Sequence, residues 1–334
     1  MISKLSFKFF QIERKLDETR FLVEDSNGQL YYGESWKQVK RLEAMTSAEI
    51  RSELEFEPLS EVGVNASDFF ATFEEAKMTK FTGDLNDPAV FVKRQRFLVD
   101  SENFRENPER FRLLTAREIE FCEVLIKDPH PNLCEYLGVV LADAPAPEDR
   151  ITDLVYTRYS IDLFTFVQRG YLRDSEQVEF IIQCVKDGIS HLHQLGYVHC
   201  DISPGNIFLI THNSEDTSTS KDDSSSEASS SSEGSASEDS GSEDSSSSEG
   251  SASSEDSSAS GESLNVRIEN VVLGDFDAAT KEGGILDLKR APDGWWPEDL
   301  ELDFGDCAVF EIDHHGLEKI KDWLLECLSE SDAS

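Results

Sequence analysis

Basic residues are scarce in this sequence. Its 334 residues include 31 Lys and Arg against 68 Asp and Glu, which gives a formal net charge of −37. Because binding to nucleic acid or to an anionic membrane needs clustered basic side chains, this charge balance argues against both kinds of partner. A transmembrane span is not expected either, since no apolar run reaches about eighteen residues.

The sequence also lacks the marks of secretion. Its start, MISKLSFKFF, has neither the long apolar stretch nor the small-residue cleavage site of a signal peptide. No CxxC pair occurs among the six cysteines, which are Cys122, Cys134, Cys184, Cys200, Cys307 and Cys327. We therefore expect reduced core cysteines and an intracellular protein, either cytoplasmic or nuclear.

A stretch from Ser214 to Ser263 is almost devoid of apolar residues. Its 50 residues include 25 Ser and 14 Asp or Glu, with one Lys and no aromatic residue. Such a segment cannot bury enough apolar surface to offset chain entropy, so we expect disorder. It is either a solvating linker or a phosphate acceptor for an acidophilic kinase, because many of its serines precede Glu or Asp.

The segments that flank this insert, Asn206–Ile210 and Val266–Leu273, both read as short strands. We therefore expect the insert to be an overgrown hairpin loop, which costs little because closure entropy grows only logarithmically with length. Elsewhere the first half of the chain reads as sheet-rich, with a hairpin around Asn27-Gly28, and the second half as helical. The predicted helices cover Trp36–Met45, Ala116–Ile126, Ser175–Leu195 and the segment after Asp313.

The string Tyr197–Ile207 carries the chemistry, because it places Asp201 and Asn206 five residues apart after a long predicted helix. Phosphoryl transfer needs a carboxylate near the acceptor hydroxyl and a nearby oxygen ligand for magnesium. The string resembles the catalytic loop of protein kinases. The resemblance implies that Asp201 orients the acceptor and that Asn206 holds magnesium.

A second acidic segment, Leu273–Asp277, resembles the kinase DFG motif with Asp277 in place of glycine. The resemblance implies that Asp275 chelates magnesium bound to ATP. Asp201 and Asp275 are 74 residues apart, and removal of the 50-residue insert leaves 24, close to what the family's hairpin requires.

In the first half, Ala89–Lys93 resembles the kinase strand whose lysine meets the phosphates of ATP. Arg117–Leu125 resembles the regulatory helix, and His130–Leu133 resembles the string that follows it. The resemblance implies an ion pair between Lys93 and Glu118, with Glu120 as the alternative partner.

These resemblances imply an α+β, bilobal protein-kinase-like fold. Residues 61–156 would form an antiparallel-sheet N-lobe with one regulatory helix, and residues 157–334 a mainly helical C-lobe that is truncated, because the chain ends soon after Leu328. Residues 1–60 would be an N-terminal extension with a hairpin and a helix.

Tyr156 would lie near the hinge that binds the nucleotide. Asp313 matches the aspartate that opens the central C-lobe helix, and Trp296-Pro297-Glu298 the end of the activation segment.

The sequence departs from the kinase pattern at several positions. Cys200 replaces the arginine of the catalytic loop, and Ser203 replaces its lysine, which removes a cation from the transferred phosphate. No GxGxxG precedes Lys93, and the nearest candidate, Glu61–Val64, offers one glycine. Between Asp275 and Glu298, Thr280 is the one hydroxyl residue, so phosphorylation has little to act on there.

Three functions fit this pattern. The first is an ATP- and magnesium-dependent protein kinase that transfers phosphate to Ser or Thr of a protein substrate. The second is a pseudokinase that binds a protein partner through its surfaces, as the missing glycine loop suggests. The third is a small-molecule phosphotransferase of the aminoglycoside or choline kinase type, because Asp277 and Pro204-Gly205-Asn206 resemble that family as well.

Overall fold

The computed structural model describes residues 5–14, 18–58, 69–94, 109–142, 149–213 and 266–332. The insert between residues 214 and 263 and the candidate phosphate lid at residues 61–64 lie outside these ranges. The chain divides into one unit of residues 1–211 and 268–334 and a second unit of residues 212–267, of which only the ends are described.

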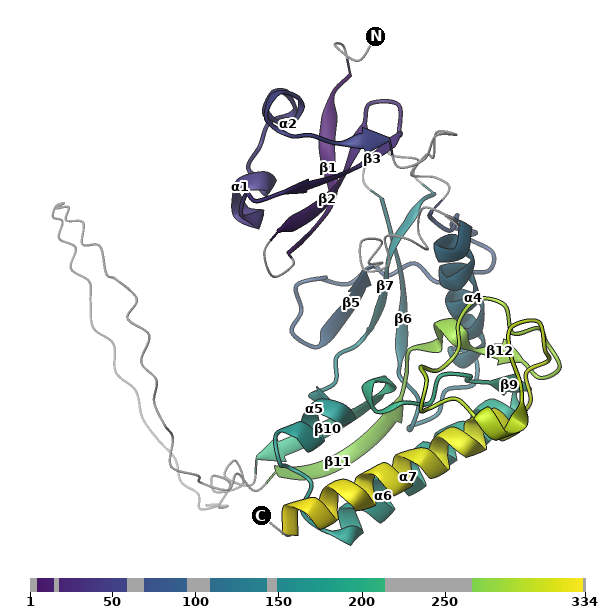
Figure 1. Cartoon of the computed structure of the whole chain (residues 1–334). Helices are drawn as coiled ribbons and strands as arrows, with labels where there is room; N and C mark the ends of the chain where they lie inside the picture. Colours follow the sequence, from purple (N-terminus) through teal and green to yellow (C-terminus); the bar gives the residue numbers. More distant parts are fainter. Residues whose placement is uncertain are drawn as a thin grey trace, which may run out of the picture. The chain divides into compact units, whose positions relative to one another are not determined.

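A four-stranded antiparallel sheet occupies the N-terminal region (Figure 1). Gly28, with a φ of 81°, turns the chain between the second and third strands, as Asn27-Gly28 predicted. The carboxylate of Asp25 fixes this turn by accepting the N–H groups of Asn27 and Gln29 at 2.8 and 3.0 Å. The strands, in sheet order, are β1 (Phe7–Arg14), β2 (Thr19–Asp25), β3 (Leu30–Ser35) and β4 (Glu57–Pro58).

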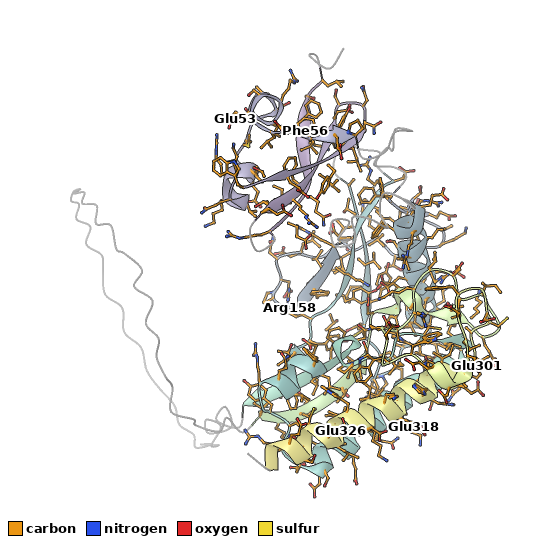
Figure 2. The ribbon with its side chains drawn as sticks, in the orientation of Figure 1. Glu53, Phe56, Arg158, Glu301, Glu318 and Glu326 are labelled. Carbon is orange, nitrogen blue, oxygen red and sulfur yellow. The ribbon has the colours of Figure 1, made fainter. Side chains whose placement is uncertain are left out.

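The helix predicted over residues 36–45 is wrong in extent. Two short helices form instead, α1 (Val39–Glu43) and α2 (Ser47–Glu53). The second begins at a capping box, in which the Thr46 hydroxyl accepts from the Glu49 N–H and the Glu49 side chain accepts from the Thr46 N–H. Apolar residues of both helices and the sheet form one core, against which Phe56 lies (Figure 2).

A second antiparallel sheet carries the first site residue. Its order is β5-β7-β6, with β5 (Val90–Arg94), β7 (Ile151–Thr157) and β6 (Tyr136–Leu141). Helix α4 (Glu109–Leu125) lies beside it (Figure 1) and covers the predicted segment except its last residue, Ile126. It begins at the first residue described after a gap. Ile119, Phe121, Cys122 and Leu125 are the apolar residues that it buries.

The rest of the chain is built around two long helices, α6 (Ser175–Gln194) and α7 (Glu311–Asp332), which pack along each other (Figure 1). Helix α6 starts where predicted, because the Asp174 carboxylate caps the Gln177 N–H at 2.8 Å. Glu318 and Glu326 lie on the exposed face of α7 (Figure 2).

Short elements precede α6 or connect it to α7. The strands flanking the insert, β10 (Ile207–Asn213) and β11 (Val266–Leu273), are hydrogen-bonded neighbours in a sheet of order β11-β10-β8, as predicted. The remaining elements are β8 (Ile161–Asp162), α5 (Leu163–Gln168), β9 (Tyr197–Val198), η3 (Pro204–Asn206), η5 (Phe276–Ala278), β12 (Thr280–Lys281) and η6 (Glu298–Leu300).

The architecture is therefore a mixed α/β one with antiparallel sheets and several helices, which confirms the coarse form of the predicted fold. All six cysteines are free thiols, and four of them are buried as expected. Cys327 is only partly buried, and the expectation of a core position is wrong for the exposed Cys307. Within the described residues, no helix has the length and apolarity needed to cross a membrane.

Candidate functional site

Two loops meet at the centre of the site. The first follows β9 and carries Asp201 and Asn206, and the second follows β11 and carries Asp275. The Gly274 N–H donates to the Asn206 carbonyl at 2.9 Å, which joins the loops through their backbones. The His199 ring bonds the Gly274 carbonyl through Nε2 at 3.0 Å, while its Nδ1 accepts the Asp201 N–H at 3.2 Å. His199, which is fully buried, therefore supports both loops through its ring.

Both loops hold a non-glycine residue in the left-handed region. Cys200 has a φ of 64° and Asp275 a φ of 61°. Such conformations cost about 1–3 kcal/mol each and persist only where the surroundings enforce them. Asp313 of α7 enforces the first, because its fully buried carboxylate accepts the N–H groups of His199 at 2.8 Å and Cys200 at 3.0 Å.

Asp201 is 3% exposed, and its two oxygens differ in their partners. Its Oδ2 lies 3.0 Å from the ammonium of Lys289, whereas its Oδ1 has no hydrogen-bond partner in the described part of the chain. A buried carboxylate oxygen without a partner is costly, so it is a natural place for a ligand donor or a metal. The Asn206 amide donates to the Asp201 carbonyl at 2.9 Å, which directs its oxygen to the other side as a possible metal ligand.

Lys93 of β5 and Glu118 of α4 form a bidentate contact. The Lys93 Nζ lies 2.7 and 2.8 Å from the two Glu118 oxygens, and it also contacts the Asp275 carboxylate. Burial alone would lower the pKa of Lys93, but the carboxylates of Glu118 and Asp275 raise it well above its ordinary value. Glu120, the alternative considered from the sequence, is exposed and pairs with Lys281 at 3.3 Å.

Tyr156 lies within β7 and not in a connection between segments. Its buried hydroxyl donates to the Glu118 carboxylate at 2.7 Å and is 3.4 Å from the Cys122 sulfur. Burial raises the pKa of Tyr156, so the hydroxyl stays protonated and able to donate. The structure thus assigns Tyr156 a contact with Glu118, and its contact with a nucleotide stays a prediction.

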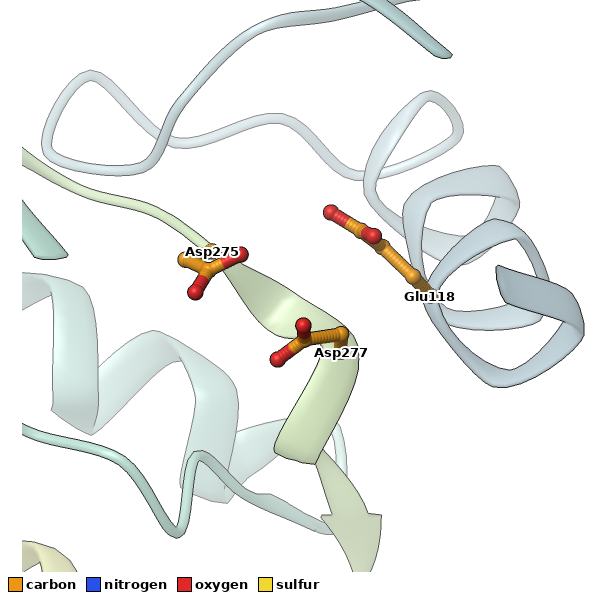
Figure 3. A group of neighbouring side chains, drawn as sticks. All are labelled: Glu118, Asp275 and Asp277. Carbon is orange, nitrogen blue, oxygen red and sulfur yellow. The ribbon is translucent and has the colours of Figure 1, made fainter. Parts of the chain in front are cut away.

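Glu118, Asp275 and Asp277 point toward one another, and one oxygen from each lies within 4.8 Å of the others (Figure 3). Lys289 joins this cluster, 2.9 Å from Asp275 and 2.6 Å from Asp277. Although burial opposes it, the two lysines lower the pKa of Asp275, whereas burial and the Asp275 charge raise that of Asp277.

The donor set fits a divalent cation such as magnesium. Hard carboxylate oxygens are the ligands that magnesium prefers, and the site offers four carboxylates, including the unpartnered oxygen of Asp201. Only the ammonium groups of Lys93 and Lys289 make ion pairs with these carboxylates within the described ranges, which leaves two excess negative charges when all six groups are ionised.

The structure brings together the five principal residues predicted from the sequence, Lys93, Glu118, Asp201, Asn206 and Asp275, which come from four separate segments. Sequence reasoning missed Lys289. The signal in the sequence was Ser203: because the catalytic loop lacks the lysine that protein kinases carry there, a cation from another segment could have been expected.

No family model and no curated protein matches the chain. Among solved structures, 1023 chains match, and one of them belongs to the yeast RNA Pol II CTD kinase CTDK-1 complex. That similarity has a TM-score of 0.43 and 14% sequence identity, and it covers 71% of this chain. This chain spans about half of the other chain's length, 55%. A similarity this low does not establish an activity, so the function is inferred from the site.

Proposed function

We propose that this protein is an ATP- and magnesium-dependent phosphotransferase of the protein-kinase-like type, which transfers phosphate to a Ser or Thr hydroxyl of a protein. The observation that carries the proposal is the bidentate pair of Lys93 and Glu118, which also engages Asp275 beside the unpartnered oxygen of Asp201. We further propose a bilobal arrangement, with β5, β6, β7 and α4 in an N-lobe of residues 61–156 and the later elements in a C-lobe of residues 157–334.

In this proposal Lys93 binds the nucleotide phosphates, because it is a partly buried ammonium fixed in position by a carboxylate partner. Asn206 and Asp275 hold magnesium, with the Asp277 carboxylate next to them. Magnesium, when bound, neutralises charge on the phosphate oxygens. Asp201 orients the acceptor hydroxyl and accepts its proton through Oδ1, the carboxylate oxygen that has no partner among the described residues.

A protein acceptor is favoured by the segment His130–Leu133, which resembles protein kinases and is built into the site. The Asn132 amide donates to the Val271 carbonyl at 2.9 Å, and the Leu273 N–H donates to the Asn132 carbonyl at 2.9 Å. This segment therefore fixes the end of β11 immediately before Asp275.

A small-molecule acceptor is the second candidate, and Asp277 favours it. Small-molecule phosphotransferases resemble this chain in having an acidic residue at that position, and the carboxylate here lies in the cluster with Asp275. Transfer to a metabolite while generic protein substrates stay unlabelled would favour this candidate over a protein kinase.

Nucleotide binding with and without magnesium tests the proposal. We expect wild type to bind ATP only weakly without magnesium, and Lys93→Ala to reduce affinity roughly tenfold or more, since one charge-assisted contact contributes about 1.5–3 kcal/mol. Glu118→Gln should also weaken binding, whereas the matched variant Glu120→Gln should not, because Glu120 is exposed and pairs with Lys281. Absence of magnesium-dependent ATP binding in wild type would refute the proposal.

Radioactive phosphate transfer separates an enzyme from a pseudokinase. Asp201→Asn keeps the size of the side chain but cannot accept the acceptor's proton as a carboxylate does. We expect it to bind ATP and to lose transfer by a factor on the order of 10² or more. ATP binding without transfer in wild type would indicate a pseudokinase.

A further inference from the structure

Lys289 is a lysine of the segment after Asp275 whose ammonium reaches the centre of the site. Its Nζ lies 3.0 Å from Asp201 Oδ2, 2.9 Å from Asp275 Oδ2 and 2.6 Å from Asp277 Oδ1. It thus touches the proposed catalytic carboxylate and the proposed metal ligand together.

The backbone around Lys289 is fixed on both sides. Two residues earlier, the Asp287 carboxylate pairs with Arg117 of α4 at 2.5 Å. Two residues later, the Ala291 N–H donates to the Cys200 carbonyl at 2.9 Å, which ties the segment to the loop that carries Asp201. Leu288 is buried beside it. The position of the ammonium is therefore built into the fold, unlike that of a lysine on an open surface.

The next residue, Arg290, is also a cation, but its side chain lies against aromatic rings and not in the carboxylate cluster. The guanidinium of Arg290 lies 5.0 Å from the ring centre of Trp296 and 5.6 Å from that of Phe304. Two consecutive basic residues are thus divided between the carboxylate site and an aromatic surface. Arg290 consequently offers a matched control for any change at Lys289.

The catalytic loop itself has no cation near Asp201. Ser203 occupies the position at which the resembling kinases carry a lysine, and a hydroxyl cannot balance the charge of a phosphate. Lys289 places an ammonium against the same aspartate from another segment. A cation held there before reaction would stabilise the charge on the transferred phosphoryl group without reorganisation.

We infer that Lys289 is the phosphate-contacting lysine of this site and replaces the cation that Ser203 cannot provide. The inference rests on the proposed function, because it assigns a role toward ATP. Lys289 would release part of its contact with Asp275 and Asp277 when magnesium binds there, and would keep Asp201 while it turns to the terminal phosphate.

The test compares four full-length proteins: wild type, Lys289→Met, the control Arg290→Met, and the double variant Lys289→Met with Ser203→Lys. Affinities for ATP and ADP are measured calorimetrically in magnesium. We expect Lys289→Met to weaken ATP roughly tenfold or more while ADP changes less than about threefold, since the lost contact is to the terminal phosphate. Arg290→Met should leave both affinities unchanged.

Transfer rates provide the second measurement. Lys289→Met should lower kcat on the order of 10²-fold, as loss of one preorganised charge contact does. Adding Ser203→Lys to this variant should raise kcat at least about tenfold above that of Lys289→Met alone. If Lys289 served only as a structural ion pair, a lysine at position 203 would not restore kcat. If Lys289→Met does not fold, Lys289→Gln replaces it in both measurements.

The outcomes separate the inference from the proposed function. If wild type binds ATP and transfers phosphate while Lys289→Met keeps its preference for ATP over ADP and its kcat, the inference is wrong and the function stands. If Lys289→Met loses both but Ser203→Lys restores neither, Lys289 is only a counter-ion of the carboxylates, and the inference is again wrong. If wild type binds no nucleotide, both the inference about Lys289 and the proposed function are wrong.

Discussion

Removal of the Asp313 carboxylate should unfold the loop that carries Asp201. Asp313 is fully buried in α7, where Oδ2 accepts the His199 N–H at 2.8 Å and Oδ1 accepts the Cys200 N–H at 3.0 Å. Oδ2 also lies 2.9 Å from His193 Nε2. In Asp313→Ala both backbone donors, which belong to residues without exposed surface, lose their acceptor.

The size of this effect follows from the two buried N–H groups. An unsatisfied buried donor costs about 1–3 kcal/mol, so two of them lower the free energy of unfolding by roughly 2–6 kcal/mol. Relaxation of Cys200, whose φ of 64° is strained by about 1–3 kcal/mol, would offset part of this loss, and the loop would open to obtain it once Asp313 no longer restrains it. A loss near the top of that range would leave a domain mostly unfolded only if its stability lies at the low end, about 5 kcal/mol, of the ordinary range.

Urea unfolding measures this loss, and calorimetric ATP binding at low urea reports on the site. The matched control is Glu318→Ala, which removes a carboxylate from the exposed face of the same helix and should change the unfolding free energy by less than about 0.5 kcal/mol. Asp313→Asn should fall between the two, because the amide keeps one acceptor but turns a donor toward the second N–H. A loss below about 1 kcal/mol for Asp313→Ala would show that the loop does not depend on this carboxylate.

Two other changes test the packing of the site. Tyr156→Phe removes the donor to the Glu118 carboxylate and should cost about 1–3 kcal/mol in urea unfolding while weakening ATP binding; unchanged values would show that Lys93 alone holds Glu118. Gly316→Ala would place a Cβ 2.6 Å from the Ile202 Cβ, so we expect a loss of about 1–3 kcal/mol. Gly205→Ala, with no atom within 4 Å of its new Cβ, should be nearly neutral, and equal losses would contradict this packing argument.

The residues predicted well from the sequence are those fixed by short spacing. Asp201 and Asn206 lie in one loop, and the backbone bond from Gly274 to Asn206 brings the second acidic motif beside them. Lys93 and Glu118 were expected as a pair from the resemblance of their two segments to protein kinases, and the structure joins them at 2.7 and 2.8 Å. The apolar pattern of the helix decided only between Glu118 and Glu120, because it sets which face turns inward.

The N-terminal region shows where local pattern fails. Strand β1 was not predicted, because its pairing with β2 shifts register between Phe9 and Gln11 and so breaks the alternation that marks a strand. The single predicted helix instead stops before Thr46, whose capping box with Glu49 starts a new one. The Thr46 signal was readable in the sequence, whereas the register shift was not.

Lys289 belongs to a third class, because its place depends on contacts between distant segments. Nothing near it in sequence marks it as a site residue, but Arg117 draws Asp287 to α4 and so directs the chain that follows toward Asp201. The next residue of the same helix, Glu118, holds Lys93. Consecutive residues of α4 thus support the two ammonium groups of the site, Glu118 by direct contact with Lys93 and Arg117 through Asp287. Because one helix carries both supports, any displacement of α4 would loosen both lysines together, and the site's excess negative charge would then repel a nucleotide instead of binding it.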